Sequence, residues 1–153
     1  MRQISKPRMR FFCLGISALL LLPCALHAQE SRSGTIKNVT GSVSLLRSGA
    51  TLAAEPGGAV VERDRISTGP NSGAAFSLRD GTTISLGPNS VVDMTSFRFD
   101  STKQEGELTL GLVTGALRFI SGLLSKRSAD NMRIATRTAT IGIRGTDFIL
   151  EAE

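Results

Sequence analysis

Tryptophan and tyrosine are absent from this 153-residue chain, and cysteine and histidine are almost absent. The two cysteines, Cys13 and Cys24, and the single histidine, His27, all lie within the first 28 residues. Zinc sites use thiolate or imidazole ligands, and nucleophilic triads use an imidazole or an equivalent base. From residue 29 onward the sequence offers neither, and it offers no disulfide. We therefore expect a protein that is not an enzyme, has no metal site and no cofactor, and is stabilised by its core alone.

The first 28 residues have the pattern of a cleaved signal peptide. Residues 1–10 carry four basic side chains and no acidic one, and residues 11–22 are almost entirely apolar. Residues 25–28 (ALHA) end on a small residue, which predicts cleavage after Ala28 and leaves residues 29–33 as a short linker. The apolar run is about a dozen residues, whereas a spanning helix needs about 20. We expect a periplasmic or secreted protein with no stable membrane span after cleavage; an uncleaved N-terminal anchor is the alternative.

The net charge of the chain changes when this segment is removed. The whole chain has 18 Lys and Arg against 13 Asp and Glu, a formal charge of +5. Because four of the basic residues and none of the acidic ones precede residue 29, the remainder carries only +1. Nucleic-acid binding needs clustered basic side chains that displace counterions from phosphates. We therefore expect no nucleic acid among the partners.

Apolar and polar residues alternate along much of the remaining chain. Residues 74–78 and 84–86 place apolar side chains at every second position, a period typical of half-buried β-strands. Asp80 and Gly81 lie between the two runs. An Asp-Gly pair in this position predicts a β-hairpin with a type I′ turn, in which both residues take a positive φ. Asp80 is accordingly interpreted as a hairpin residue and not as a general acid.

The same alternation extends toward the C-terminus. Leu108, Leu110 and Leu112 share one face of a predicted strand that continues beyond Gly115. Residues 119–129 are the longest stretch that could be helical, but Ser121 and Gly122 weaken it, so a loop or a single turn is expected. The pattern predicts an all-β fold: one domain at residues 34–153 of short antiparallel or rolled strands, arranged as a meander, a sandwich or a short solenoid-like roll.

Two short sequences recur within the chain. GPNS occurs at residues 69–72 and again at residues 87–90, and VTGSV at residues 39–43 is echoed by VTGAL at residues 113–117. Such repetition suits a stacked or rolled sheet, although two copies do not make a repeat array. The prolines of both GPNS copies are expected in turns.

A glycine-rich stretch at residues 135–148 (ATRTATIGIRGTDF) surrounds one arginine and one aspartate. Gly142 and Gly145 are expected to allow close approach of neighbouring backbone. The last eight residues, 141–148, resemble the vGvRGTxF run that closes the FecR domain, a family named after a periplasmic iron-dicitrate regulator. Six residues carry this motif: Gly142, Arg144, Gly145, Thr146, Asp147 and Phe148.

Arg144 and Asp147 allow two interpretations. In the first, they belong to a turn in which Arg144 donates to carbonyls and a carboxylate and fixes a glycine-rich corner. In the second, they form an exposed pair that recognises a ligand. We favour the structural role, and Thr146 is likewise expected to cap a turn.

The resemblance to the FecR domain covers residues 35–150. Residues 60–90 are similar to the central Gd.v.Tg..s.a.l...DGs.l.l...s pattern of the family, which includes Asp80 and Gly81. One departure is VVERD at residues 60–64, where the family often has a Gly-Asp pair. Family members often continue with further strands after the final motif, so the last strand of this chain is expected to form an exposed edge.

The resemblance also implies a class of function. The family archetype contacts a sigma factor in the cytoplasm, crosses the inner membrane once and receives a signal from an outer-membrane transporter through its periplasmic domain. This chain looks like a free-standing exported FecR domain. We therefore expect a regulatory or signalling module that binds an envelope protein through a sheet edge or surface loops. A structural or polysaccharide-associated envelope protein is the alternative.

Two further groups of residues were considered as sites. Four carboxylates could in principle provide a glycosidase pair, but their spacing brings no two together: Asp80, Asp93, Asp100 and Glu107. Phe97 and Phe99 flank Arg98 and could form a stacking patch for a sugar or a base, although alternating phenylalanines on a strand usually belong to the core.

Overall fold

The computed structural model describes residues 32–144 and 147–153. The expected signal peptide at residues 1–28 and its cleavage site lie outside the described residues, as do Gly145 and Thr146. The first described strand, β1 (Arg32–Thr40), begins two residues before the expected start of the domain.

Strands form two layers that are continuous through one long strand, β9 (Glu105–Ile120). Sheet A contains β1, β4 (Ala59–Val61), β6 (Gly73–Leu78), β7 (Thr83–Leu86), the second half of β9, and β12 (Asp147–Ala152). Sheet B contains β2 (Val43–Arg47), β3 (Ala50–Ala53), β5 (Arg65–Thr68), β8 (Val91–Asp100), the first half of β9, β10 (Met132–Ala135) and β11 (Thr140–Gly142). The predicted all-β single domain is confirmed, as a rolled sandwich.

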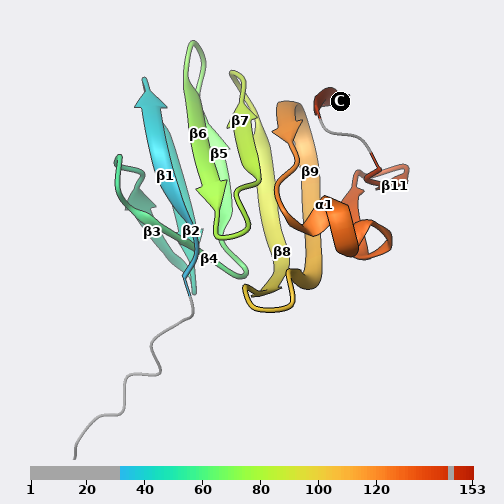
Figure 1. Cartoon of the computed structure of the whole chain (residues 1–153). Helices are drawn as coiled ribbons and strands as arrows, with labels where there is room; N and C mark the ends of the chain where they lie inside the picture. Colours follow the sequence, from blue (N-terminus) through green and yellow to red (C-terminus); the bar gives the residue numbers. More distant parts are fainter. Residues whose placement is uncertain (1–31, 145–146) are drawn as a thin grey trace, which may run out of the picture.

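The strand order explains the two layers. Hydrogen-bonded neighbours follow the order β3-β2-β5-β8-β9-β7-β6-β1-β4. The four strands before β9 in this order belong to sheet B and the four after it to sheet A, and the two sets face each other. Figure 1 shows β2 behind β1 and β5 behind β6. Neighbouring strands are antiparallel, except that β10 runs parallel to β9. The core between the layers consists of the inward side chains of each alternating strand, among them Phe76, Ile84, Met94 and Leu110.

Four corners carry the chain from one sheet to the other along the same edge. They lie between β1 and β2, between β5 and β6, between β7 and β8, and within β9 at Gly115. Backbone hydrogen bonds join them in sequence: Gly69 N donates to Ser42 O at 2.9 Å, Asn89 N to Gly69 O at 3.1 Å, and Gly87 N to Ala116 O at 2.9 Å. We call this arrangement the corner row.

The two recurring sequences meet in the corner row. Ser72 of the first GPNS accepts a hydrogen bond from Ser42 N at 2.9 Å, and Ser90 of the second accepts one from Ala116 N at 2.9 Å. Each serine packs on the glycine of a VTG sequence. Gly41 and Gly115 have φ of +70° and +85°, and a Cβ on either would overlap the adjacent serine hydroxyl. The repeated sequences therefore build matching corners.

The β6–β7 hairpin has a different turn from the one predicted. Gly81 has a φ of +86°, but Asp80 is not among the residues with positive φ. Gly81 N donates to Leu78 O at 3.0 Å, and Leu78 N donates to Thr82 O at 2.8 Å. This is a type I turn followed by a left-handed glycine, a three-residue loop. The predicted hairpin is confirmed and its predicted type I′ turn is wrong.

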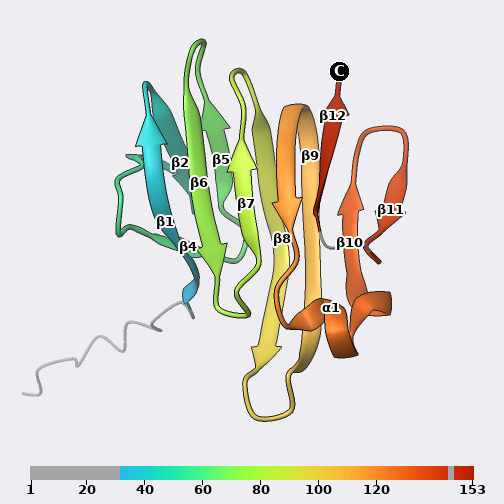
Figure 2. The ribbon, with the colours of Figure 1, turned by 45° about the horizontal axis from the view of Figure 1, so that its top comes forward.

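After β9 the chain makes one helical turn, α1 (Leu124–Arg127), and a 3₁₀ turn at Ala129–Asn131 before β10. The expected loop or single turn is therefore confirmed. Buried Leu124 anchors this segment to the core at the open end of the sandwich. Figure 2 shows α1 at the end opposite the corner row, beside the β8–β9 hairpin.

We expect Gly115→Ala to destabilise the fold by about 3 kcal/mol, because it adds left-handed backbone strain to steric overlap with Ser90. Gly81→Ala is the matched control, since Gly81 has a similar φ and open space around it. It should cost about 1 kcal/mol. Urea unfolding of both variants measures the difference. Equal losses would contradict a tightly packed corner.

Candidate functional site

Asp80 ties the β6–β7 hairpin to the chain that follows β9. Its buried carboxylate accepts hydrogen bonds from Thr82 N at 3.0 Å and Thr82 Oγ1 at 2.7 Å. Its carbonyl accepts one from Leu123 N at 2.8 Å, and Thr82 Oγ1 also accepts one from Gly122 N at 3.0 Å. The carboxylate and the carbonyl of Asp80 are thus both engaged in structure, as expected for a hairpin residue.

Arg144 and Asp147 of the FecR-like motif do not contact each other. The Arg144 guanidinium donates to Asp130, and both side chains are about four-fifths exposed. Asp147 instead accepts two hydrogen bonds from Arg118 on β9, at 3.0 and 2.6 Å. The Arg118 guanidinium lowers the pKa of Asp147, and the same hydrogen bonds raise the pKa of Arg118. Arg144 thus donates to a carboxylate, as the structural interpretation expects, and its part in fixing a glycine-rich corner stays a prediction because Gly145 and Thr146 lie outside the described residues.

The other motif residues have separate roles. The Phe148 ring stacks on Phe119, with 5.3 Å between centroids, and so attaches β12 to the core. Gly142 was expected to permit close backbone approach, but no atom lies within 4 Å of the place where its Cβ would be. Gly145 and Thr146 lie outside the described residues. The motif therefore joins β11 to β12 and presents no site of its own in its described positions.

The departure from the family pattern at residues 60–64 has a structural counterpart. Arg63 adopts a φ of +67°, the left-handed region in which the glycine of a Gly-Asp pair would be unstrained. The following Asp64 is fully buried and accepts two hydrogen bonds from Arg47, at 2.8 and 2.7 Å, and one from Val61 N at 2.8 Å. This buried ion pair joins β2 to the turn between β4 and β5.

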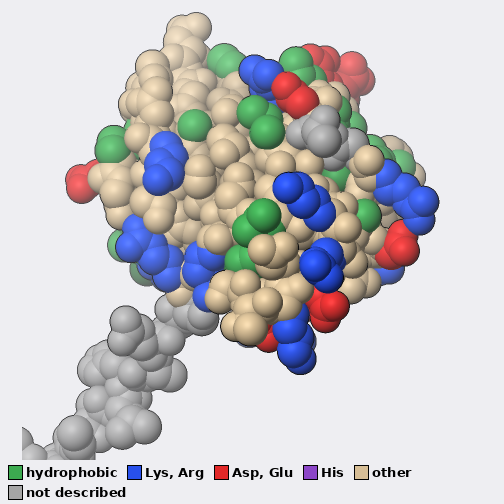
Figure 3. Space-filling view, viewed as in Figure 1, with side chains coloured by type: hydrophobic (Ala, Val, Ile, Leu, Met, Phe, Trp, Pro, Cys, Tyr) green, Lys and Arg blue, Asp and Glu red, His purple; other side chains and the backbone are tan. Residues whose placement is uncertain are grey.

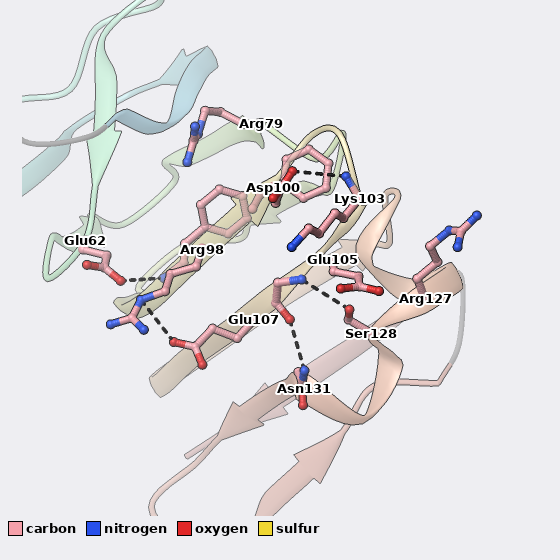
Figure 4. Close-up of a pocket in the computed structure, with 13 residues that line it drawn as sticks. Glu62, Arg79, Arg98, Asp100, Lys103, Glu105, Glu107, Arg127, Ser128 and Asn131 are labelled. Atoms are coloured by element: carbon pink, nitrogen blue, oxygen red, sulfur yellow. Dashed lines mark hydrogen bonds and ion pairs between the residues drawn. The ribbon is translucent and has the colours of Figure 1, made fainter.

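A pocket of about 910 Å³ opens at the end of the sandwich opposite the corner row. We call it the hairpin pocket, because the β8–β9 hairpin forms much of its wall (Figure 4). Phe97 and Phe99 of β8 contribute its apolar surface, and Arg79 from the β6–β7 turn lies over the Phe97 ring at 5.7 Å. Phe97 is buried as a core residue, whereas Phe99 is only partly buried. The two phenylalanines thus serve the core and the pocket together.

Most acidic groups of the hairpin pocket already have partners. Glu62 accepts a hydrogen bond from Phe97 N at 2.9 Å, and Glu107 lies 3.7 Å from Arg98. Asp100 accepts from Lys103 N at 3.1 Å and Thr102 N at 2.9 Å, and these bonds lower the pKa of Asp100. Asp100 therefore shapes the hairpin turn.

The basic side chains of the hairpin pocket form fewer hydrogen bonds and ion pairs within the described chain than its acidic side chains. Lys103 and Arg127 form no ion pair within the described part of the chain, and Arg79 meets only the Phe97 ring. On the face shown in Figure 3, basic side chains are spread over the lower half with few acidic ones between them. The sequence did not indicate that Arg79, Lys103 and Arg127 line one pocket, because they come from three separate segments.

Of the four carboxylates with a possible catalytic role, Asp100 and Glu107 both line the hairpin pocket, and each of the four has hydrogen-bond or ion-pair partners of its own. Asp93 pairs with Arg65 at 2.6 and 2.8 Å, and the other three have the partners given above. Across residues 32–144 and 147–153, no group of three or more acidic or histidine side chains could hold a metal ion. No helix within those same ranges is long and apolar enough to cross a membrane.

We expect Asp64→Ala to lower the free energy of unfolding by about 3 kcal/mol, since it removes the acceptor of a buried ion pair and of the Val61 N–H. Arg144→Ala, which removes an exposed pair, should change it by less than about 1 kcal/mol. Thermal or urea unfolding gives both values. A large loss for Arg144→Ala would contradict this expectation and support the interpretation that Arg144 fixes the corner.

Comparison with known proteins agrees with the pattern of motifs. The family model described as FecR protein matches residues 64–153, more than half of the chain, from the turn before β5 to the C-terminal strand β12. No curated protein and no solved structure matches the chain. The match includes both Asp80-Gly81 and the glycine-rich motif at residues 141–148. The chain belongs to the FecR protein family.

Proposed function

We propose that this protein is a non-catalytic periplasmic module that binds a protein partner and acts in regulation or signalling at the cell envelope. Membership of the FecR family suggests a regulatory or signalling protein of the envelope. The signal-peptide pattern of residues 1–28 supports export. The lack of cysteine and histidine from residue 29 onward supports a binding role over catalysis.

The exposed edge of β12 carries this proposal. Among the described strands, β12 pairs only with β9, so its other edge makes no strand pairing. The turn between β10 and β11 faces the C-terminal end of this edge, where Thr136 and Glu151 line the same pocket (Figure 2). Strand β12 is six residues long, whereas the other terminal strands β3, β4 and β11 have three or four. Short edges resist strand addition, and a longer open edge provides backbone donors and acceptors for a partner strand.

The side chains of β12 suit a protein partner. Ile149 is 68% exposed, the most exposed of the large hydrophobic residues, and it lies between Asp147 and Glu151 on the outer face. Ile120 is also exposed and neighbours Asp147 across the β9–β12 ladder. An apolar anchor with acidic neighbours can bind strongly while charge limits pairing with a second copy.

We expect a photo-crosslinking amino acid at position 149 to capture one protein in the periplasm. Thr51, exposed on the short edge strand β3, is the control position and should capture little. Mass spectrometry identifies the captured protein. Equal capture from both positions would remove the support for β12 as the docking edge, and capture of glycan in place of protein would favour the alternative function.

Export makes a separate prediction. If the signal peptide is cleaved as proposed, the mature protein recovered from periplasm begins at Gln29, as N-terminal mass spectrometry would show. Recovery of the intact N-terminus in the inner-membrane fraction would contradict cleavage and support an anchor.

One observation favours the alternative of a structural or polysaccharide-associated protein. Small polar residues form a row across the outer face of sheet A, where Thr35, Ser77 and Thr83 are neighbours in register. Ser77 Oγ and Thr83 Oγ1 lie 3.3 Å apart. Such a flat hydroxyl-rich face could contact a glycan, and binding to isolated peptidoglycan tests it.

A further inference from the structure

We propose that the unpaired edge of β12 receives an extended segment of the protein partner as a further strand of sheet A. This segment has apolar side chains at alternate positions and a lysine or arginine that lies beside Glu151. The inference rests on the proposed function, which places the partner at β12, and it names the chemistry of the segment that binds there. Contact with the outer face of β12 alone would not meet it, because the segment also packs against the inside of the sandwich.

The two sheets differ by one strand on this side of the molecule. On the edge of β9 away from β7 and β8, sheet B continues through β10 and β11, whereas sheet A continues through β12 only (Figure 2). On the other side of β9, each sheet has four strands. In the described chain, sheet A therefore has no strand opposite β11. One added strand would give the two layers equal width.

The inward side chains of β12 are incompletely covered. Phe148 and Leu150 pack against the core but are only partly buried. Their neighbours in the β9 ladder, Phe119 and Leu117, are 0% and 1% exposed. The difference arises because β9 has a strand on both sides and β12 has a strand on one. Apolar side chains of an added strand would cover Phe148 and Leu150.

Strand β11 also has an incompletely covered apolar side chain. Ile141 is in register with Ile134 of β10, and residues paired in this way point to the same face of a sheet. Because Ile134 is fully buried in the core, Ile141 also faces the inside of the sandwich, but it is only partly buried. The added strand would lie opposite Ile141. The binding segment therefore needs apolar side chains on the side that faces the core.

A small pocket indicates the charge of the segment. It has a volume of about 300 Å³ and lies between the β10–β11 turn and the C-terminal end of β12. Its lining holds two carboxylates, Glu151 and Glu153, against one basic side chain, Arg137. Neither carboxylate forms an ion pair within the described chain, and the neighbour of Glu151 on β9 is the uncharged Ala116. A lysine or arginine of the added strand would therefore meet a net negative site.

A second copy of this chain fits the edge less well than a different protein. Two β12 strands paired antiparallel about Ile149 would place Asp147 of each copy opposite Glu151 of the other, and like charges in that position are destabilising. Moreover, β12 contains two acidic residues and no basic one, so no register of this pairing supplies a cation to Glu151. The occupant is thus a segment of a different protein.

The test uses the exported protein and a capped synthetic peptide of alternating valine and lysine. Hydrogen exchange followed by NMR should show new protection of β12 amides in the presence of the peptide, while amides of the edge strand β3 stay unchanged. Methylation of one alternate set of peptide nitrogens should abolish binding, and methylation of the other set should not. Only one edge of an added strand pairs with β12, and alternate N–H groups point to opposite edges.

Two variants test the side-chain contacts. Ile141→Ser should weaken binding of the peptide about tenfold, because it removes apolar surface that the added strand covers. Leu46→Ser is the matched control: Leu46 is 39% exposed on β2, which β5 and β8 separate from β9, so binding should be unchanged. Glu151→Gln, at an exposed position, should weaken binding about threefold.

Three results would overturn the inference: equal tolerance of methylation at both sets of peptide nitrogens, equal binding of a peptide with aspartate in place of lysine, and no binding of the valine-lysine peptide. Photo-crosslinking at position 149 separates the inference from the proposed function. Undiminished capture in the Ile141→Ser and Glu151→Gln proteins would place the partner on the outer face alone, so the inference would fail while the proposed function stands. No capture without these substitutions would count against the proposed function itself.

Discussion

The row of hydrogen-bonded corners along one edge of the sandwich is the constraint on which the rest of the structure depends. At each corner the chain must turn from one sheet to the other while its backbone polar groups stay paired. Ser72 and Ser90 supply the missing acceptors for Ser42 N and Ala116 N. The facing glycines leave room for those hydroxyls. Because the corners are bonded to one another, they fix the order and register of the strands that leave them.

The opposite end of the molecule is built from hairpins and the α1 segment. There the chain turns within a sheet, as in the β6–β7 and β8–β9 hairpins, and α1 packs against the end of the core. Asp80 and Thr82 attach the first hairpin to the segment after β9. Loops supported by a rigid scaffold are a common place for binding sites. The hairpin pocket lies at this end.

The glycine-rich motif identifies the family without forming a compact site. Its arginine contacts Asp130, its aspartate contacts Arg118, and its phenylalanine stacks on Phe119. Each side chain thus connects the C-terminal strands to a different part of the domain. The strand β12, which begins at Asp147 of the motif, provides the edge on which the proposed function rests.

Local sequence determined the strands, the β6–β7 hairpin and the single helical turn. The signals for these elements, the alternation of apolar and polar side chains and the positions of glycines, extend over only a few residues. The sequence also determined which side-chain chemistry is lacking, since no fold can supply cysteine or histidine to residues 29–153. Tertiary structure alone decided the partners of Arg144 and Asp147 and brought Arg79, Lys103 and Arg127 to the lining of one pocket. Those contacts join residues far apart in the chain, and their distances depend on how the sheet rolls.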